Sequence, residues 1–316
     1  MARILQVCNS DFTLAKFLIP LISKLVEVGH TVECVCEGDR IPDEIVKLGL
    51  VVHQFKFPKR GNPLEFIGGI KRMRKIIRAG NYQCVNSHNR NSSIIARVAA
   101  WLEKVPAKIY TARGFYFHDD QGPLAKELTV RLEALLARIT DYTLSPSNED
   151  VEYVVRRDII KREQIECIGN GISTRRFTPR WPRDGVEREL GFTSGCFRIG
   201  ATGRLVQGKG FIDLLNAFAD FQKSAGNAEL LLIGGNIAQD IFPFQRQFLA
   251  RVKELGLEQR VVVTGVTDCV EKHLATCDIF VLPSYREGVP RALLEAMSMG
   301  LASVATDIRE IGRAHV

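Results

Sequence analysis

Hydrophobic residues along the chain fall into short runs, separated by longer stretches in which they recur every three or four positions. The short runs are rich in Val, Ile and other strand-forming residues. Stretches such as 12–29 (FTLAKFLIPLISKLVEVG) have helical spacing, with Pro20 predicting a kink or a helix start. Strands that alternate with helices indicate βαβ units and a parallel sheet. In the first half the predicted strands are 3–8, 31–37, 51–57, 84–88, 108–113, 142–147 and 165–170.

The second half of the chain repeats this alternation, with helical patterns such as 211–225 after its strands. The segment 174–190 between the halves is rich in Pro, Arg and Gly and breaks both periodicities, which indicates a linker. We therefore predict an α/β fold of two Rossmann-like doubly wound domains, 1–175 and 190–309, that face each other across a cleft. The predicted strands of the second domain are 197–203, 229–235, 260–265 and 279–284.

The C-terminal end predicts an incomplete second domain. A last strand-like run, 302–307, is followed by neither a covering helix nor a further strand. We expect such a chain to expose a sheet edge and apolar surface, and to be poorly stable. Residues 311–316 resemble a translated sequencing adapter, so we interpret 310–316 as a non-native tail and exclude it from the fold.

The composition is that of a globular protein with room for two cores. The chain has 316 residues, of which 46% are hydrophobic and 25% charged, and this length favours two domains. No apolar run is long enough to cross a bilayer, and the N-terminus leads into a predicted strand rather than a signal peptide. We therefore expect a cytoplasmic protein, whose cysteines are reduced because they lack zinc-binding spacing.

The net charge of +7 suggests an anionic partner, and one segment concentrates this charge. Residues 62–80 predict a basic amphipathic helix. Either this helix covers a core with a solvated basic face, or it binds an anionic membrane surface and makes the protein peripheral on the inner face of the plasma membrane. No nucleic-acid partner is expected. The apolar positions are Leu64, Ile67, Ile70, Met73 and Ile77, and the basic ones are Lys71, Arg72, Arg74, Lys75 and Arg78.

Two carboxylates flank a predicted helix start near the C-terminal end. Glu287 and Glu295 are eight positions apart, and Pro290 between them suits the first position of a helix that follows the strand 279–284. A helix start at the carboxyl end of a strand favours a phosphate, and carboxylates on either side can accept hydrogen bonds from sugar hydroxyls. The alternative is that Glu295 pairs with Arg291, four residues earlier, and that Glu287 is solvated.

A glycine-rich loop, GRLVQGKG at 203–210, follows another predicted strand and carries Arg204 and Lys209. Glycines permit a close approach of the main chain to a ligand, and guanidinium and ammonium groups can bind a diphosphate. The loop lacks the residue order of a P-loop. Taken singly, such cations are more often surface charges.

Together, GRLVQGKG, the GNGIS segment at 169–173 and SYREGVPRALLEAMSMG resemble glycosyltransferase family 4, the retaining transferases of GT-B fold. The resemblance covers nearly the whole chain. It implies that Arg204 and Lys209 bind the diphosphate of a nucleotide-sugar. Glu287 would hold hydroxyls of the transferred sugar, and Glu295 the nucleotide ribose, with main-chain amides completing the donor site. The implied substrate-binding residues are Arg204, Lys209, Gly288, Val289, Pro290, Arg291 and Glu295.

The reaction that the resemblance implies is sugar transfer with retention of configuration, by default from a UDP-hexose, through an oxocarbenium-like state. The two cations and the helix amides would stabilise the charge on the leaving diphosphate. No Asp-x-Asp triplet occurs in the sequence, so we expect neither a metal nor another cofactor. The expected acceptor is a cell-surface polysaccharide, a lipopolysaccharide or a lipid-linked oligosaccharide, bound by the N-terminal domain.

The N-terminal domain departs from the family pattern. Many members carry a histidine before a glycine after the strand that ends here in YTAR, where this chain has Arg113 and Gly114, and the first loop, CNSDFTLAK, lacks the usual glycines. Either His118 replaces that histidine near the transferred sugar, or Arg113 itself contacts a phosphate. The candidate catalytic residues are therefore Glu287, Arg113 and His118. His88, at the end of a predicted strand, either faces the cleft or is structural.

Two other functions stay open at this point. A nucleotide-sugar epimerase or hydrolase of the same fold would use the same donor site, and the chain could instead be an inactive nucleotide-sugar-binding fragment. A dinucleotide oxidoreductase is disfavoured, because the first turn between strand and helix lacks the Gly-x-Gly-x-x-Gly pattern.

Overall fold

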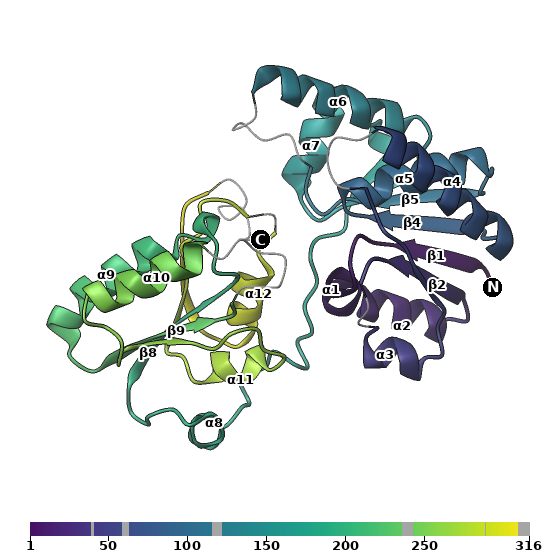
Figure 1. The fold of residues 1–316 in the computed structure, drawn as a ribbon. Helices are drawn as coiled ribbons and strands as arrows, with labels where there is room; N and C mark the ends of the chain where they lie inside the picture. Colours follow the sequence, from purple (N-terminus) through teal and green to yellow (C-terminus); the bar gives the residue numbers. More distant parts are fainter. Residues whose placement is uncertain (39–40, 59–62, 116–121, 236–242, 288, 309–316) are drawn as a thin grey trace. The chain divides into compact units, whose positions relative to one another are not determined.

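The computed structural model of the chain describes residues 1–38, 41–58, 63–115, 122–235, 243–287 and 289–308 (Figure 1). The chain divides into two compact units, Met1–Gly169 and Asn170–Val316. Each unit is built on one parallel sheet, with seven strands in the first and five in the second. The α/β class predicted from the alternation of strands and helices is confirmed.

The first sheet has the strand order β3-β2-β1-β4-β5-β6-β7, and all neighbouring strands are parallel. The direction in which the chain crosses the sheet reverses between β1 and β4, as in a doubly wound fold. Every strand predicted for this half is observed. The bounds are β1 (Arg3–Val7), β2 (Thr31–Cys36), β3 (Val52–Gln54), β4 (Cys84–His88), β5 (Ala107–Thr111), β6 (Tyr142–Ser145) and β7 (Ile165–Cys167).

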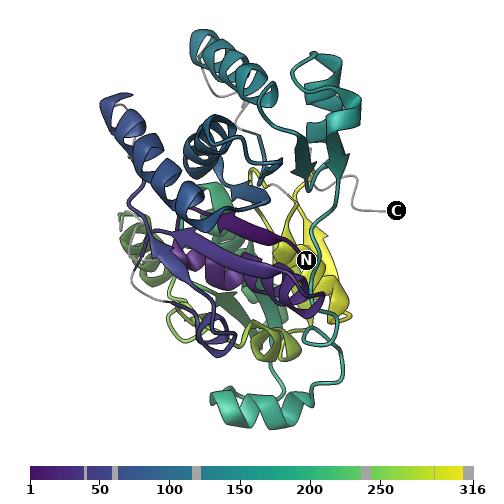
Figure 2. The same cartoon turned by 90° about the vertical axis from the view of Figure 1, so that its right-hand side faces the viewer.

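Helices cover both faces of the first sheet (Figures 1 and 2). They are α1 (Asp11–Thr13), α2 (Ile19–Glu27), α3 (Asp43–Lys47), α4 (Pro63–Gly80), α5 (Arg90–Leu102), α6 (Pro123–Ala137) and α7 (Asn148–Arg156). α4 and α5 pack on one face, over Leu5 and Val85, whereas α2 and α3 pack on the other, around Val32 and Cys34. Because successive residues of a strand point to opposite faces, the central strands supply both cores.

The predicted helix 12–29 is divided in two. A π-helical turn, Leu14–Leu18, precedes α2, which has Pro20 in its first turn. A proline is tolerated there, because the main-chain N–H that it lacks would have no partner within the helix. Pro20 thus lies in the first turn of α2, but residues 11–27 are helical without a break, so it marks the change from π to α geometry and not the beginning of the helical segment.

α4 differs from the prediction in where its apolar residues lie. Ile77 is buried in the core as expected, but Leu64 and Ile67 are 75% and 51% exposed. α4 packs closely on α5 at Gly69, where an added Cβ would lie 2.9 Å from Cδ1 of Ile95. Phe66, in the first turn, and Ile70 pack on the same core as Ile77. Leu64 and Ile67 lie on the other face of the helix, which is exposed and which Lys71 and Lys75 share. The prediction that Leu64 and Ile67 belong to a core-facing stripe is therefore wrong.

The second sheet has the order β10-β9-β8-β11-β12, again parallel throughout. α9 and α10 cover one face and α11 and α12 the other, so every residue of the central strand β9 is buried. The strands are β8 (Phe197–Thr202), β9 (Ala228–Ile233), β10 (Val261–Val263), β11 (Ile279–Leu282) and β12 (Ala302–Ala305). The helices are α8 (Arg183–Leu190), α9 (Phe211–Ala225), α10 (Pro243–Glu254), α11 (Val270–Ala275) and α12 (Arg291–Ser298).

The segment 174–190, in which the sequence placed a linker, lies within the second unit. It ends in α8, and Phe177 and Trp181 pack in the same core cluster as Leu293 of α12. Proline and glycine interrupt the periodicity of this segment, but its two aromatic residues anchor it. The predicted tail 310–316 lies outside the described residues, and the terminal strand β12 is largely exposed, with Val304 at 59%.

Candidate functional site

The two motifs that carry the predicted chemistry lie at one edge of the second sheet. The glycine-rich loop 203–210 follows β8, and the loop 283–290 follows β11, the neighbouring strand. The order of the strands reverses between β8 and β11, and in such sheets ligands bind beyond the carboxyl ends of the two strands at this switch point. The topology therefore places both loops where a ligand would bind.

The main chains of the two loops are in direct contact. The amide of Tyr285 donates to the carbonyl oxygen of Gly208 at 3.1 Å. Gly210 has a φ of +66°, and a Cβ at this position would lie 2.0 Å from the carbonyl oxygen of Pro283. Only glycine allows so close an approach in this conformation. Arg204 is exposed at the beginning of the same loop.

Lys209 and Glu287, predicted separately from two motifs, form an ion pair. Nζ of Lys209 lies 2.5 Å from Oε1 of Glu287, and the two side chains are 22% and 12% exposed. Ser284 Oγ donates to the same carboxylate oxygen at 2.6 Å. The alternative in which Glu287 is a solvated loop acid does not describe this arrangement. The site therefore joins one cation and one carboxylate at the carboxyl edge of the sheet.

Glu295 lies in the second turn of α12 and is mostly buried. Arg291 Nη2 is 3.4 Å from its Oε1, so the helical pair considered in the sequence is present. Burial raises the pKa of the Glu295 carboxyl, and the positive charges of Arg291 and Arg176 oppose this only in part. A carboxylate that is costly to ionise in its buried place can gain from hydroxyl donors of a ligand. Pairing with Arg291 and binding of a ribose are compatible.

The start of α12 is tied to the beginning of the second unit. Pro290 is the N-cap residue, and the side-chain amide of Asn170 donates to the carbonyl oxygen of Val289 at 3.0 Å. Asn170 belongs to the GNGIS segment, so this hydrogen bond connects two of the sequence motifs. Gly288 lies outside the described residues. The main-chain amides that follow Pro290 open the helix and suit an anionic group.

The candidates of the N-terminal half belong to the first unit. Arg113 follows β5, with its guanidinium carbon 5.1 Å from the ring centroid of Phe17. His118 lies outside the described residues. His88 is fully buried at the end of β4, and its Nε2 is 2.9 Å from Oε1 of Gln6. Burial and the charge of Arg113 lower the pKa of His88 to about 3, so this imidazole is neutral, which favours the structural interpretation.

Two polar residues of the site were missed in the sequence as individual candidates. Ser284 lies inside the quoted motif but carries no charge, and Asn170 lies inside GNGIS. Their contacts with Glu287 and Val289 depend on how the loops fold. Among the residues that the structure describes, no group of three His, Cys, Asp or Glu side chains is arranged to hold a metal ion. Transfer without a metal stays a prediction.

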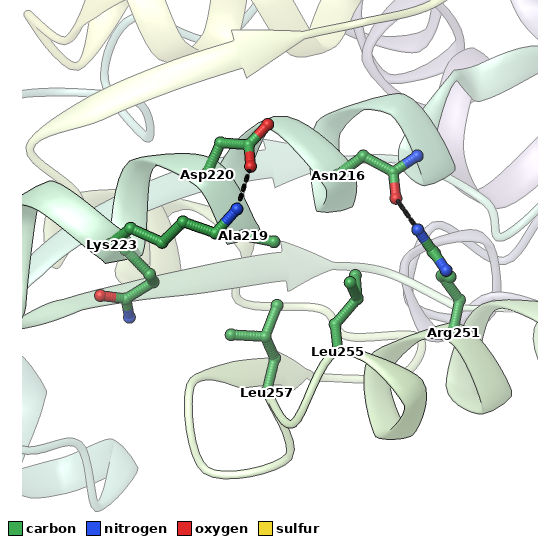
Figure 3. Close-up of a pocket in the computed structure, with 8 residues that line it drawn as sticks. Asn216, Ala219, Asp220, Lys223, Arg251, Leu255 and Leu257 are labelled. Carbon is green, nitrogen blue, oxygen red and sulfur yellow. Dashed lines mark hydrogen bonds and ion pairs between the residues drawn. The ribbon is translucent and has the colours of Figure 1, made fainter.

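A cavity of about 550 Å³ lies elsewhere in the second unit, between α9 and α10 (Figure 3). Asn216 accepts hydrogen bonds from Nε and Nη2 of Arg251 at 3.0 Å, and Lys223 pairs with Asp220 at 2.7 Å. These polar groups already satisfy one another. No residue of the two loops lines the cavity, which is therefore separate from the site at the sheet edge.

Two Rossmann-like units, with the glycine-rich loop and the spaced acids on the second, define the GT-B class of glycosyltransferases. Residues 14–176 match the family described as Glycosyltransferase Family 4, and residues 196–315 match the family described as Glycosyl transferases group 1. The first match alone covers more than half of the chain. The chain therefore belongs to glycosyltransferase family 4, as the motifs predicted.

Curated relatives are transferases of bacterial glycan synthesis. The UDP-Gal:alpha-D-GlcNAc-diphosphoundecaprenol alpha-1,3-galactosyltransferase of Escherichia coli is 27% identical over 239 residues, which cover 74% of this chain and 60% of the relative. The capsular polysaccharide biosynthesis glycosyltransferase CapM of Staphylococcus aureus is 24% identical, over 71% of this chain and 58% of the relative. The chain thus spans about 60% of the length of these two relatives.

Solved structures share the fold. A glycosyltransferase from Rickettsia africae aligns with a TM-score of 0.78 at 19% identity, over 97% of this chain and 79% of the other. HepE from Anabaena, in complex with UDP and glucose, aligns with a TM-score of 0.77 at 16% identity, over 98% of this chain and 82% of the other. At these identities the likeness concerns the fold alone.

Proposed function

We propose that the chain carries the donor site of a retaining glycosyltransferase that moves a hexose from a UDP-hexose to a glycan or lipid-linked acceptor. The observation that carries the proposal is the contact between Lys209 and Glu287, which brings together loops 78 residues apart. It sets a cation suited to a diphosphate beside a carboxylate suited to sugar hydroxyls. In a nucleotide-sugar these two groups are neighbours, because the diphosphate is bonded to the anomeric carbon.

The transfer step requires stabilisation of the negative charge on the departing diphosphate. The bond between the anomeric carbon and the diphosphate oxygen breaks, and the electron pair leaves with the diphosphate. Arg204, Lys209 and the first amides of α12 supply positive charge and donors for it, and Glu287 holds the sugar in place. The acceptor hydroxyl then bonds to the anomeric carbon on the face that the diphosphate leaves, and its proton passes to the departing diphosphate oxygen. No step in this scheme calls for a metal.

Glu295 suits the nucleotide ribose. Its carboxyl is buried beside Arg291, one and a half turns or less from the start of the helix, where the diphosphate would bind. Ribose hydroxyls are donors and would offset part of the cost of keeping this carboxylate buried. The complex of HepE with UDP and glucose supports a UDP-linked donor for a chain of this fold.

The relatives support a lipid-linked or polysaccharide acceptor. The Escherichia coli relative is a galactosyltransferase for a GlcNAc-diphosphoundecaprenol, and CapM acts in capsular polysaccharide biosynthesis. An acceptor with a diphosphate carries negative charge, for which Arg113 at the carboxyl end of β5 is a suitable partner. We therefore favour Arg113 as an acceptor-phosphate contact and keep His118 as the alternative near the transferred sugar.

A membrane-bound acceptor calls for a protein that reaches the membrane surface. Among the described residues, no helix is long and apolar enough to span a bilayer. α4 offers a peripheral surface instead, because Leu64 and Ile67 are exposed at its start and Lys71 and Lys75 follow on the exposed side. Such a helix end suits the boundary between lipid head groups and acyl chains, with ammonium groups on anionic phosphates.

α6 adds apolar surface at the same end of the helical layer. Leu124 and Leu128, in its first turns, are 74% and 60% exposed. Arg90, at the start of α5, donates to Oγ1 of Thr129 in the second turn of α6 at 3.2 Å, so the first part of α6 lies near the start of α5. This supports a peripheral position on the inner face of the plasma membrane, with the starts of α4 and α6 as the contacting surface.

The proposed function is tested by donor-dependent transfer. The purified chain is incubated with a panel of nucleotide-sugars and a GlcNAc-diphospholipid acceptor, and the product is analysed with and without acceptor. Transfer that requires the acceptor and is lost in Glu295→Ala supports the proposal. Sugar released or epimerised equally well without acceptor would favour the hydrolase or epimerase alternative. Normal turnover by Glu295→Ala would count against the donor site itself.

A further inference from the structure

Ser284 is fixed by the main chain on both sides of it. It is the second residue after β11, and its side chain is completely buried. Tyr285 donates its amide to Gly208, and the carbonyl of Pro283 lies against Gly210. Both contacts are made by backbone atoms, so the hydroxyl of Ser284 has a defined position relative to the glycine-rich loop.

The hydroxyl of Ser284 donates a hydrogen bond to one oxygen of the Glu287 carboxylate. A carboxylate only accepts, so Ser284 Oγ is the donor in its 2.6 Å bond to Oε1. Lys209 Nζ bonds the same oxygen at 2.5 Å. No described residue makes a hydrogen bond to Oε2. Two donors on one oxygen fix the rotation of the carboxylate, and the second oxygen, which receives no donor from the part of the chain that the structure describes, can accept from a ligand.

The two partners of Oε1 have different tasks. Under the proposed function, Lys209 also binds the diphosphate, so its ammonium group is shared once the donor is present. Ser284 is neutral and keeps its hydroxyl on the carboxylate in both states. We infer that Ser284 is a positioning residue, which holds Glu287 so that Oε2 accepts from a hydroxyl of the transferred sugar; this rests on the proposed function of the site.

A purely structural role of Ser284 predicts a different effect on nucleotide binding. If the hydroxyl of Ser284 only satisfied buried polar groups, its loss would loosen the loop and weaken binding of every nucleotide. A positioning role affects only the sugar. UDP lacks the hexose, so its binding does not depend on Oε2 of Glu287, whereas binding of UDP-hexose does. Comparison of UDP with UDP-hexose therefore separates the two roles.

Calorimetric titration of the full chain with UDP, UDP-glucose and UDP-galactose tests the inference. For Ser284→Ala we expect a Kd for UDP within about twofold of wild type and a Kd for the preferred UDP-hexose weaker by about tenfold, the usual effect of losing a hydrogen bond to a charged group. Ser298→Ala is the matched control, because its hydroxyl donates to the carbonyl of Phe177 at 2.7 Å, and it should bind both ligands like wild type.

A second variant decides whether Ser284 acts through Glu287. In a Glu287→Gln background, Ser284→Ala should raise the Kd for UDP-hexose by less than about a further twofold, since the effects of two substitutions in one hydrogen-bond network are not additive. Full additivity, or an equal loss for UDP and UDP-hexose, overturns the inference. If Glu287→Gln weakens the binding of UDP-hexose and Ser284→Ala does not, the inference about Ser284 fails while the proposed donor site stands. If wild type binds no UDP-hexose, both are wrong.

Discussion

The side-chain amide of Asn170 donates a hydrogen bond of 3.0 Å to the carbonyl oxygen of Val289. Asn170 is the first residue of the second unit, and Val289 lies in the turn that opens α12. One hydrogen bond thus holds the turn that precedes the amides proposed to bind the donor. The position of that turn depends on a residue more than a hundred positions earlier, which no local motif would indicate.

Asn170→Asp should weaken UDP binding by about tenfold. The new carboxylate has the same shape but meets the Val289 carbonyl with an acceptor in place of a donor, so the turn shifts. Calorimetric titration with UDP measures the effect. Asn227→Asp is the control, since its Nδ2 contacts the carbonyl of Gly195 in the same unit, away from the site. Equal binding by Asn170→Asp and wild type would contradict the prediction.

Lys209→Met should lower kcat/KM for the donor by about a hundredfold. The change removes the ammonium that faces both Glu287 and the expected diphosphate, and loss of one such stabilising group typically costs this much. Steady-state kinetics with the preferred UDP-hexose measures it. Lys223→Met, which breaks the exposed pair with Asp220, should leave kcat/KM within about twofold. Similar losses in both variants would show that the effect is not specific to the site.

Glu295→Gln should stabilise the chain at neutral pH while it weakens donor binding. Burial raises the pKa of Glu295 in the folded state above its usual 4.5, so the folded protein pays a cost for ionising it at higher pH. The Tm of the variant should exceed that of wild type at pH 7, and the difference should shrink as the pH falls through the raised pKa and disappear below about 4.5. Thermal melts across this range test the prediction.

The matched control for that experiment is Glu152→Gln. Glu152 also pairs with an arginine four residues away, Arg156 at 3.5 Å, but its side chain is 60% exposed. Its removal should change Tm little at any pH. A Glu295→Gln variant that melts below wild type at pH 7 would mean that the pair with Arg291 outweighs the cost of burial.

Gly210→Ala should destabilise the second unit by roughly 2 kcal/mol or more, from left-handed strain and the contact with the Pro283 carbonyl. Gly208→Ala is the control two residues earlier, because an added Cβ there meets nothing within 4 Å. Chemical denaturation measures both variants. Equal stability of the two would show that the loop can move away from β11 at little cost.

Lys71→Gln with Lys75→Gln should weaken binding to anionic vesicles by roughly thirtyfold, since each lysine near a charged membrane contributes about 1 kcal/mol. Co-sedimentation with phosphatidylglycerol vesicles measures it, with neutral vesicles for comparison. Lys223→Gln with Lys253→Gln, in the second unit, is the matched control of equal charge. No difference between the two pairs would exclude α4 as the membrane surface.

The sheets and most helices could be predicted from the sequence because their signals are local. β9 contains the apolar run LLLI and α2 has Pro20 in its first turn, so periodicity and a single proline suffice. The error at Leu64 and Ile67 has a different cause. Leu64, Ile67 and Ile70 recur every third residue, but each such step turns the side chain by about 60° around the helix axis. Ile70 therefore packs on the core, whereas Leu64 lies on the exposed face.

The charged residues of the site could be proposed from motifs, whereas their partners could not. Lys209 and Glu287 carry charged side chains, and the charge indicates which ligand groups each can bind. Ser284 and Asn170 are common in loops, and their roles follow from hydrogen bonds to residues far along the chain or around a turn. The sequence alone could not choose between Arg113 and His118 for a similar reason, since both follow β5 and no motif distinguishes their roles.

The contact of Gly210 with Pro283, directly after β11, divides the wall of the site into two parts of different composition. At Gly210 the wall is main chain against main chain, and no side chain fits there. Around Glu287 the wall consists of side chains, which can be exchanged one at a time. Under the proposed function, binding of the diphosphate can therefore stay constant while the preference among hexoses changes. A fold built in this way can acquire different sugar specificities while the groups that contact the diphosphate stay the same.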